Sequence, residues 1–163
     1  EGDPPAEAWP RAGELEFRRV SLRYGQGLPL ALTEVSFQVP GGQRVGVVGR
    51  TGSGKSSMVA CLFRLREVED GAILVDGLDI AAIGLRCLRR ALTVVPQDPV
   101  LMAGTVRKNL DPFGEASAER LRAAVRRAEL AVDEADADAL LGRGLDAGGS
   151  NLSCGERQLL CLA

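Results

Sequence analysis

The stretch GRTGSGKSS, residues 49–57, constrains the fold of this chain more than any other part of the sequence. The apolar run RVGVV (residues 44–48) precedes it, and this run is typical of a buried strand. Apolar residues recur at helical spacing after it, which predicts a helix that begins near Lys55. A strand, a glycine-rich loop and a helix in this order predict an α/β fold in which the loop holds a ligand.

The loop matches the pattern G-x-x-x-x-G-K-[ST] from Gly49 to Ser56. Its glycines let successive backbone N–H groups converge on one point, and the following helix directs its positive end at the same place. Lys55 then supplies a charge for the β- and γ-phosphates of a nucleotide, and Ser56 offers a hydroxyl oxygen to Mg²⁺. A glycine-rich turn ahead of a helix also occurs by chance, but the strand before it and the helix after it favour a nucleotide site. The residues predicted to bind the nucleotide here are Gly49, Arg50, Thr51, Gly52, Ser53, Gly54, Lys55, Ser56 and Ser57.

Composition excludes several other functions. The chain has 163 residues, about one domain, and its 20 basic and 22 acidic side chains give a net charge of −2, which argues against a general nucleic-acid binder. It contains no histidine, so histidine-based acid/base or metal chemistry is excluded within these residues. The four cysteines form no CxxC pair and are expected to be reduced thiols. No apolar run reaches the ~20 residues that a membrane-spanning helix needs.

The rest of the chain divides into a sheet-forming part and a helical part. Residues 1–13, rich in proline and acid, predict a linker. Alternating apolar residues predict strands in LEFRRVSL and in LTEVSFQV (residues 32–39), and AILV (residues 72–75) and LTVV (residues 92–95) predict short buried strands. From about residue 98 the pattern is helical, with Ser117 as an expected N-cap. Near the end, Ser153 and Glu156 fit the capping box S-x-x-E, which predicts another helix start.

Three further stretches narrow the class of protein: LRYGQG with Tyr24, VVPQDPVLMAGTVRKNLDPF with Gln97, and NLSCGERQLLCLA at residues 151–163. Together with the glycine loop they resemble the nucleotide-binding domain of ABC transporters. Within that family they resemble the second such domain of subfamily C, the multidrug-resistance-associated exporters. The resemblance begins at the WP pair of residues 9–10 and covers nearly the whole chain.

The resemblance implies a fold and a set of roles. The fold would be a P-loop NTPase core, with residues 49–56 as its Walker A motif, joined to an antiparallel β-subdomain and a helical subdomain. Residues 14–163 would form part of this domain, with the helical subdomain at approximately 98–163. Tyr24 would stack on adenine, and Gln97 would contact Mg²⁺ and water and couple the domain to the membrane. The signature motif, which in ABC dimers faces the ATP bound by the opposite domain, would be Leu152, Ser153, Cys154, Gly155, Glu156, Arg157 and Gln158.

The chain departs from the family pattern in its signature and at its end. It has LSCGE where the wider family has LSGGQ, so Cys154 adds a side chain and Glu156 brings a negative charge near a phosphate. We therefore expect the site that this motif completes to be the weaker one of a dimer. The Walker B aspartate, the glutamate that polarises water and the switch histidine would follow Ala163. No catalytic residue is thus expected within these residues, and alone they are not expected to hydrolyse ATP efficiently.

The sequence therefore predicts the ATP-binding part of an ABC exporter, an ATPase that couples ATP and Mg²⁺ binding to transmembrane export of organic anions or drugs. The expected partners are a second nucleotide-binding domain, in a head-to-tail dimer, and transmembrane domains in the same polypeptide; no nucleic acid is expected. The expected location is the cytoplasmic face of a membrane. Two alternatives are a soluble ABC ATPase that does not transport and a non-catalytic nucleotide-sensing domain. A P-loop kinase would explain neither Gln97 nor LSCGE.

Overall fold

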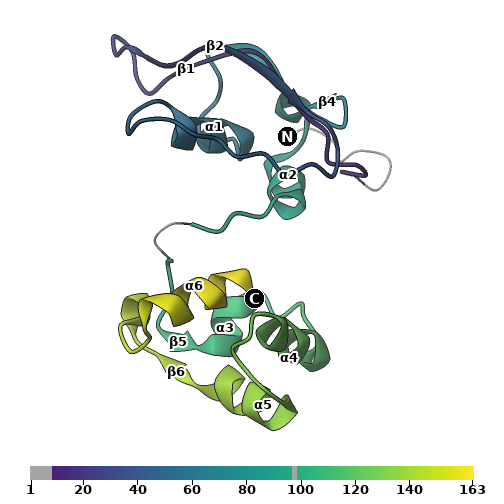
Figure 1. The fold of residues 1–163 in the computed structure, drawn as a ribbon, viewed down its shortest axis with the longest axis vertical. Helices are drawn as coiled ribbons and strands as arrows, with labels where there is room; N and C mark the ends of the chain where they lie inside the picture. Colours follow the sequence, from purple (N-terminus) through teal and green to yellow (C-terminus); the bar gives the residue numbers. More distant parts are fainter. Residues whose placement is uncertain (1–8, 97–98) are drawn as a thin grey trace. The chain divides into compact units, whose positions relative to one another are not determined.

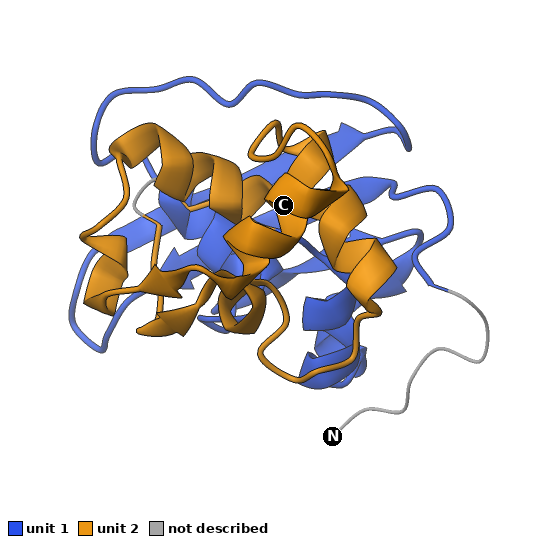
Figure 2. Cartoon of the chain, turned by 90° about the horizontal axis from the view of Figure 1, so that it is seen from below, with its two compact units in different colours: residues 1–93 blue, residues 94–163 orange. Residues whose placement is uncertain are grey.

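The computed structural model describes residues 9–96 and 99–163. The chain forms two compact units, residues 1–93 and residues 94–163, which we call the first and the second unit (Figure 2). Each unit has its own cluster of buried apolar side chains, so each is described by itself.

The first unit is built on a four-stranded sheet. Its strands are β1 (Leu15–Arg23), β2 (Leu30–Val39), β3 (Asp70–Val75) and β4 (Leu78–Asp79), in the order β2-β1-β3-β4. Every neighbouring pair is antiparallel. Because β1 lies in the middle, its Phe17 is paired with a residue on each side and is buried. The expected alternating strands and the expected strand at residues 72–75 are confirmed.

Helices cover this sheet on the side of its apolar residues. They are α1 (Lys55–Leu62), the short 3₁₀ helix η1 (Ile80–Ala82) and α2 (Leu85–Ala91). Figure 1 shows α1 lying along the ribbon of β1 and β2. The predicted helix start at Lys55 is confirmed. The shared core of strands and helices consists of Phe17, Val20, Leu22, Leu32, Cys61, Ile73, Val75, Ile80, Ile83 and Leu88.

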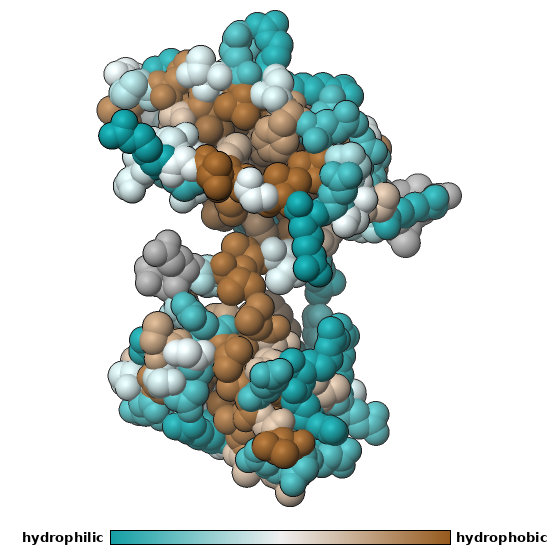
Figure 3. Space-filling model, viewed as in Figure 1, coloured by the Kyte–Doolittle hydropathy of each residue, from teal (hydrophilic) through white to brown (hydrophobic). Residues whose placement is uncertain are grey.

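Two of the expected buried strands are not strands in the structure. Residues 44–48 and 92–95 have no strand assignment, and their valines are exposed, with Val48 at 93%, whereas Leu92 packs partly buried against the core. Hydrophobic side chains accordingly lie at the molecular surface (Figure 3). A strand exists only where a neighbouring chain segment accepts its N–H and C=O groups, and none of the described segments pairs with these two. AILV differs because β1 lies beside it.

The described residues that precede β1 are attached to the turn between β3 and β4. The Trp9 indole N–H donates to the Val75 carbonyl oxygen at 3.0 Å. The Asp76 carboxylate accepts the backbone N–H groups of Arg11, Ala12 and Glu14 at 2.6, 3.0 and 2.7 Å. Burial raises the pKa of Asp76, but the amide groups of residues 11–14 outweigh that effect and lower the pKa overall. A charged carboxylate therefore fixes this segment to the sheet.

The second unit is mainly helical. Its helices are α3 (Val106–Leu110), α4 (Ala118–Arg127), α5 (Glu134–Gly142) and α6 (Cys154–Leu162). A ribbon of β5 (Gly104–Thr105) and β6 (Gly144–Leu145) and the 3₁₀ helix η2 (Ala147–Gly149) join them. The core of this unit consists of Leu101, Val106, Leu121, Val125, Ala131, Ala137, Leu141, Leu145, Leu152 and Leu160.

Side-chain caps explain where three of these helices, α3, α4 and α5, begin. The Ser117 hydroxyl accepts the Arg120 N–H at the start of α4, as the sequence predicted. Thr105 and Asp133 cap α3 and α5 in the same way. Such caps satisfy one of the N–H groups that a helix leaves without an internal partner, and each contributes roughly 1 kcal/mol. No described helix is both long and apolar enough to cross a bilayer.

Candidate nucleotide site

The glycine loop and the start of α1 form a backbone cradle in the first unit. Gly52 and Gly54 both have left-handed backbone angles, with φ of 81° and 93°. A Cβ at Gly49 would lie 2.5 Å from the Ser53 hydroxyl oxygen, and one at Gly54 would lie 2.9 Å from the Ala31 carbonyl oxygen. Glycine is therefore needed at Gly52 and Gly54 for the backbone angles, and at Gly54 also for the close approach to backbone, whereas the atom near Gly49 belongs to a side chain that can turn away.

The N-terminus of α1 is open to an anion. Gly54 is its N-cap residue, no side chain caps it, and its first turn contains no acidic residue. The first N–H groups of the helix are thus without a side-chain acceptor, at the end where the helix dipole is positive. Helices α3, α4, α5 and α6 begin with a side-chain cap, whereas α2, which follows Gly84, also lacks one. This arrangement fits a phosphate group.

Lys55 is folded over the loop. Its Nζ donates to the carbonyl oxygens of Gly49 and Arg50 at 2.7 and 2.8 Å. Within the described ranges, no Asp or Glu forms an ion pair with Lys55. The ammonium charge is therefore held at the cradle by neutral oxygens alone and stays available to a phosphate.

The two serines after Lys55 face different surroundings. Ser56 is exposed beside the lysine, whereas Ser57 is buried. The Ser57 hydroxyl oxygen accepts a hydrogen bond from the Tyr24 hydroxyl at 3.1 Å. The structure therefore leaves Ser56 free to face a ligand and uses Ser57 to connect α1 with the end of β1.

Tyr24, to which the resemblance assigns stacking on adenine, lies beside Ser57 at the start of α1. Its side chain is 44% exposed, so one part of its ring is accessible. The Arg66 guanidinium carbon lies 5.5 Å from the ring centroid, in cation–π range. Neither Arg66 nor the Tyr24–Ser57 hydrogen bond was predicted. No signal in the sequence could have indicated them, since each joins segments that are distant along the chain.

The other predicted residues lie elsewhere. Gln97 is outside the described residues. The signature motif, residues 152–158, forms the start of α6 in the second unit, with Leu152 buried in the core and Cys154 and Gly155 exposed. Arg50, Thr51 and Ser53 are exposed on the loop.

The predicted capping box at α6 is confirmed. The Ser153 hydroxyl accepts the Glu156 N–H at 3.2 Å, and the Glu156 carboxylate accepts the Ser153 N–H at 2.7 Å. The backbone N–H of Ser153, then its hydroxyl and the Arg143 guanidinium, lower the pKa of Glu156. Glu156 is therefore a charged carboxylate fixed at the helix start.

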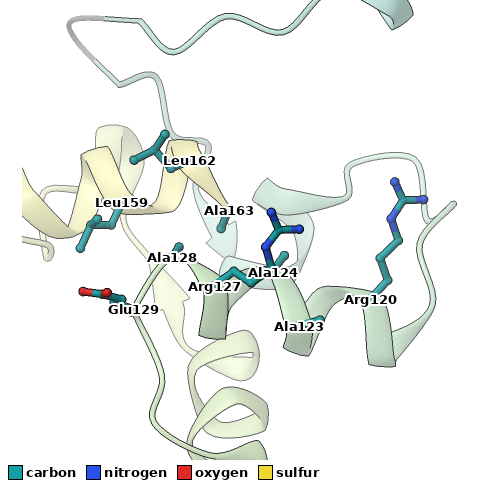
Figure 4. A pocket seen from close by; sticks show the side chains of 9 residues that line it. All are labelled: Arg120, Ala123, Ala124, Arg127, Ala128, Glu129, Leu159, Leu162 and Ala163. Carbon is teal, nitrogen blue, oxygen red and sulfur yellow. The ribbon is translucent and has the colours of Figure 1, made fainter. Parts of the chain in front are cut away.

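A groove of about 550 Å³ lies between α4 and α6. Figure 4 shows Arg120 and Arg127 on α4 and the apolar residues Leu159 and Leu162 on α6 around it. None of the predicted site residues lines it. The groove is thus lined by residues of the second unit that lie outside the signature motif.

A glycine cradle, a lysine and an uncapped helix N-terminus define a phosphate-loop nucleotide-binding domain. The sequence pattern of the ABC transporter family matches residues 32–163. The chain belongs to the ABC transporter family.

Relatives in subfamily C are similar over the whole chain. Human ATP-binding cassette sub-family C member 3 is 52% identical over 163 residues, which are 100% of this chain and 11% of that protein. The rat sub-family C member 2 is 47% identical over 98% of this chain and 10% of its own length. The predicted resemblance to subfamily C is confirmed. The chain spans about a tenth of the length of these relatives.

A solved structure supports the fold. A bacterial Atm1-family ABC exporter with ATP bound matches 98% of this chain with a TM-score of 0.84 and 32% identity, over 28% of that exporter chain. The expected mixed α/β fold with an antiparallel sheet and a helical part is thereby confirmed.

Proposed function

We propose that this chain is the ATP-binding part of an ABC exporter that couples ATP binding and hydrolysis to the transmembrane export of organic anions or drugs. The observation that carries this proposal is the position of Lys55, whose ammonium is held by neutral carbonyls at an uncapped helix N-terminus. The similarity to subfamily C members and to an exporter with ATP bound supports the choice of transport over other ATP-driven work.

The loop binds the triphosphate in this proposal. The backbone N–H groups of residues 49–57 surround the β- and γ-phosphates, and Lys55 turns from the Gly49 and Arg50 carbonyls to the phosphate oxygens. The exposed ring of Tyr24 stacks on adenine, while its hydroxyl holds α1 through Ser57. The nucleotide thereby connects the end of β1 to the loop.

Mg²⁺ fits this site only together with the nucleotide. The described residues contain no group of three or more His, Cys, Asp or Glu side chains that could hold a metal ion. The exposed Ser56 hydroxyl is the one oxygen that the loop motif itself provides for the ion, and Gln97 is the second proposed contact. The remaining ligands would be phosphate oxygens and water. When bound, Mg²⁺ neutralises phosphate charge.

The partners follow from the signature motif. We propose that α6 presents its start to the ATP bound by a second nucleotide-binding domain, in a head-to-tail dimer. Transmembrane domains, which contact the region of Gln97, would place this dimer at the cytoplasmic face of a membrane. The exposed valines of residues 44–48 and 92–95 support the idea that further strands pack beside these two segments. Such strands would cover the valines and supply hydrogen-bond partners for the backbone of both segments.

Tyr24 variants test both ATP binding and export. In inside-out vesicles that contain the full-length transporter, uptake of an organic anion should require ATP. Tyr24→Ala should raise the ATP concentration for half-maximal uptake, because a base–aromatic stack is worth about 1–3 kcal/mol, or roughly 5- to 150-fold. Tyr24→Phe keeps the ring and loses only the bond to Ser57, so its effect should be smaller.

Ser57→Ala is the matched control for Tyr24→Phe, since it removes the same hydrogen bond from the other side. The two variants should have equal effects. Equal ATP dependence of Tyr24→Ala and Tyr24→Phe would show that the ring does not stack on the base. Uptake that proceeds without ATP would contradict the exporter.

A further inference from the structure

Arg143 links the end of α5 to the start of α6. It follows Gly142, the last residue of α5, and its guanidinium makes two contacts. Nη1 lies 3.3 Å from a carboxylate oxygen of Glu156, and Nη2 donates to the Asn151 carbonyl oxygen at 3.2 Å. The side chains of the pair are 42% and 41% exposed, so water screens it and its effect on stability is small.

Both oxygens of Glu156 have partners. One accepts the Ser153 N–H in the capping box and the other faces Arg143. The Ser153 hydroxyl is itself occupied by the Glu156 N–H. The N–H groups of Cys154 and Gly155 are the first of the helix, so they have no acceptor within it. They remain the donors that α6 can direct at an anion.

The charge of Glu156 opposes an anion at this place. A carboxylate within the first turn of the helix repels a phosphate that approaches the Cys154 and Gly155 amides, and it competes with that phosphate for them. Arg143 brings a positive charge to the carboxylate oxygen that does not accept the Ser153 N–H, and it thereby favours the position that this side chain has in the capping box.

We infer that Arg143 is a positioning residue for the signature motif: it keeps the Glu156 carboxylate in the capping box and offsets its charge, so that the start of α6 can still accept a phosphate. This inference rests on the proposed function, in which α6 faces the ATP of a second domain. It also bears on the expectation of a weak site, because Arg143 offsets part of the negative charge that distinguishes Glu156 from the uncharged glutamine of the wider family.

A double-mutant cycle in the full-length transporter tests the pairing. Arg143→Gln should raise the KM for ATP of the ATPase reaction about threefold to fivefold, the upper end of what a partly exposed ion pair contributes. In the Glu156→Gln background the same change should alter KM less than twofold, since glutamine keeps the capping box but carries no charge with which Arg143 could pair. The effect should shrink in high salt. Arg143→Lys keeps the charge and should remain within twofold of the wild type.

The possible outcomes separate this inference from its alternatives. An equal rise of KM in both backgrounds would contradict it, because Arg143 would then act through the Asn151 carbonyl or directly on the nucleotide. No change in either background would contradict it as well. Thermal unfolding of each variant, expected within about 2 °C of the wild type for an exposed pair, excludes loss of fold as the cause. If Lys55→Ala left ATP turnover intact, the proposed function itself would fail.

Discussion

Lys55→Ala should weaken the binding of MgATP to the full-length transporter roughly 30- to 150-fold, because removing one partner of a charged hydrogen-bonded pair costs about 2–3 kcal/mol. The structure gives the reason for so large an effect. Among the described residues the ammonium is bonded to two carbonyl oxygens of its own loop and to no carboxylate, so its full charge is available to the phosphates. ATPase activity and vesicle uptake should fall with the affinity. Calorimetric titration with MgATP measures the change.

Lys108→Ala is the matched control. Lys55 and Lys108 are the two lysines of the chain, and Lys108 lies on α3 in the second unit. Its side-chain charge has no part in the proposed site, so its replacement should change the affinity less than twofold. Equal losses in the two variants would mean that net charge, and not the position of Lys55 in the loop, determines binding.

Gly71→Ala should destabilise the first unit by about 3–5 kcal/mol, because the alanine would both strain the backbone and overpack the sheet. Gly71 lies in β3 with φ of 86°, a left-handed angle that other residues rarely adopt. A Cβ there would lie 2.4 Å from the carbonyl oxygens of Arg18 and Arg19 in β1. These are backbone atoms of the central strand, so the clash can be relieved only by moving the sheet. A drop of more than about 10 °C in the unfolding temperature is expected.

Gly77→Ala separates the two causes of this loss. Gly77 also has a left-handed angle, with φ of 76°, but a Cβ there would meet no atom within 4 Å. It should therefore cost only the backbone strain, about 1 kcal/mol. If the two alanine variants unfolded at the same temperature, the close approach of β3 to β1 at Gly71 would not be the cause of the larger loss of stability.

Features set by neighbouring residues could be predicted from the sequence. The start of α1 after the glycine loop, the Ser117 cap and the Ser153–Glu156 capping box each involve residues within four positions of one another, and the structure has all three. The hydrogen bonds of the two caps join residues of the same helix start and do not depend on the rest of the fold, so the sequence pattern is sufficient.

Features set by distant partners could not be predicted in the same way. The apolar runs at residues 44–48 and 92–95 have the composition of buried strands, but a strand also needs a neighbour, and composition does not say whether one is present. The contacts of Arg66 with Tyr24 and of Arg143 with Glu156 depend on long, flexible side chains that reach across turns and loops. Such pairs appear only once the backbone is placed.

The exchange of backbone amide hydrogens at the glycine loop tests the central claim most directly. In the full-length transporter, MgATP should slow deuterium uptake in the peptide that covers residues 49–57, because the phosphates would accept N–H groups now left without side-chain acceptors. AMP, which lacks the β- and γ-phosphates, should protect the loop far less, and Lys55→Ala should reduce the protection by MgATP. Unchanged exchange in the loop at saturating MgATP, or protection confined to the groove between α4 and α6, would contradict a phosphate-binding role for residues 49–57.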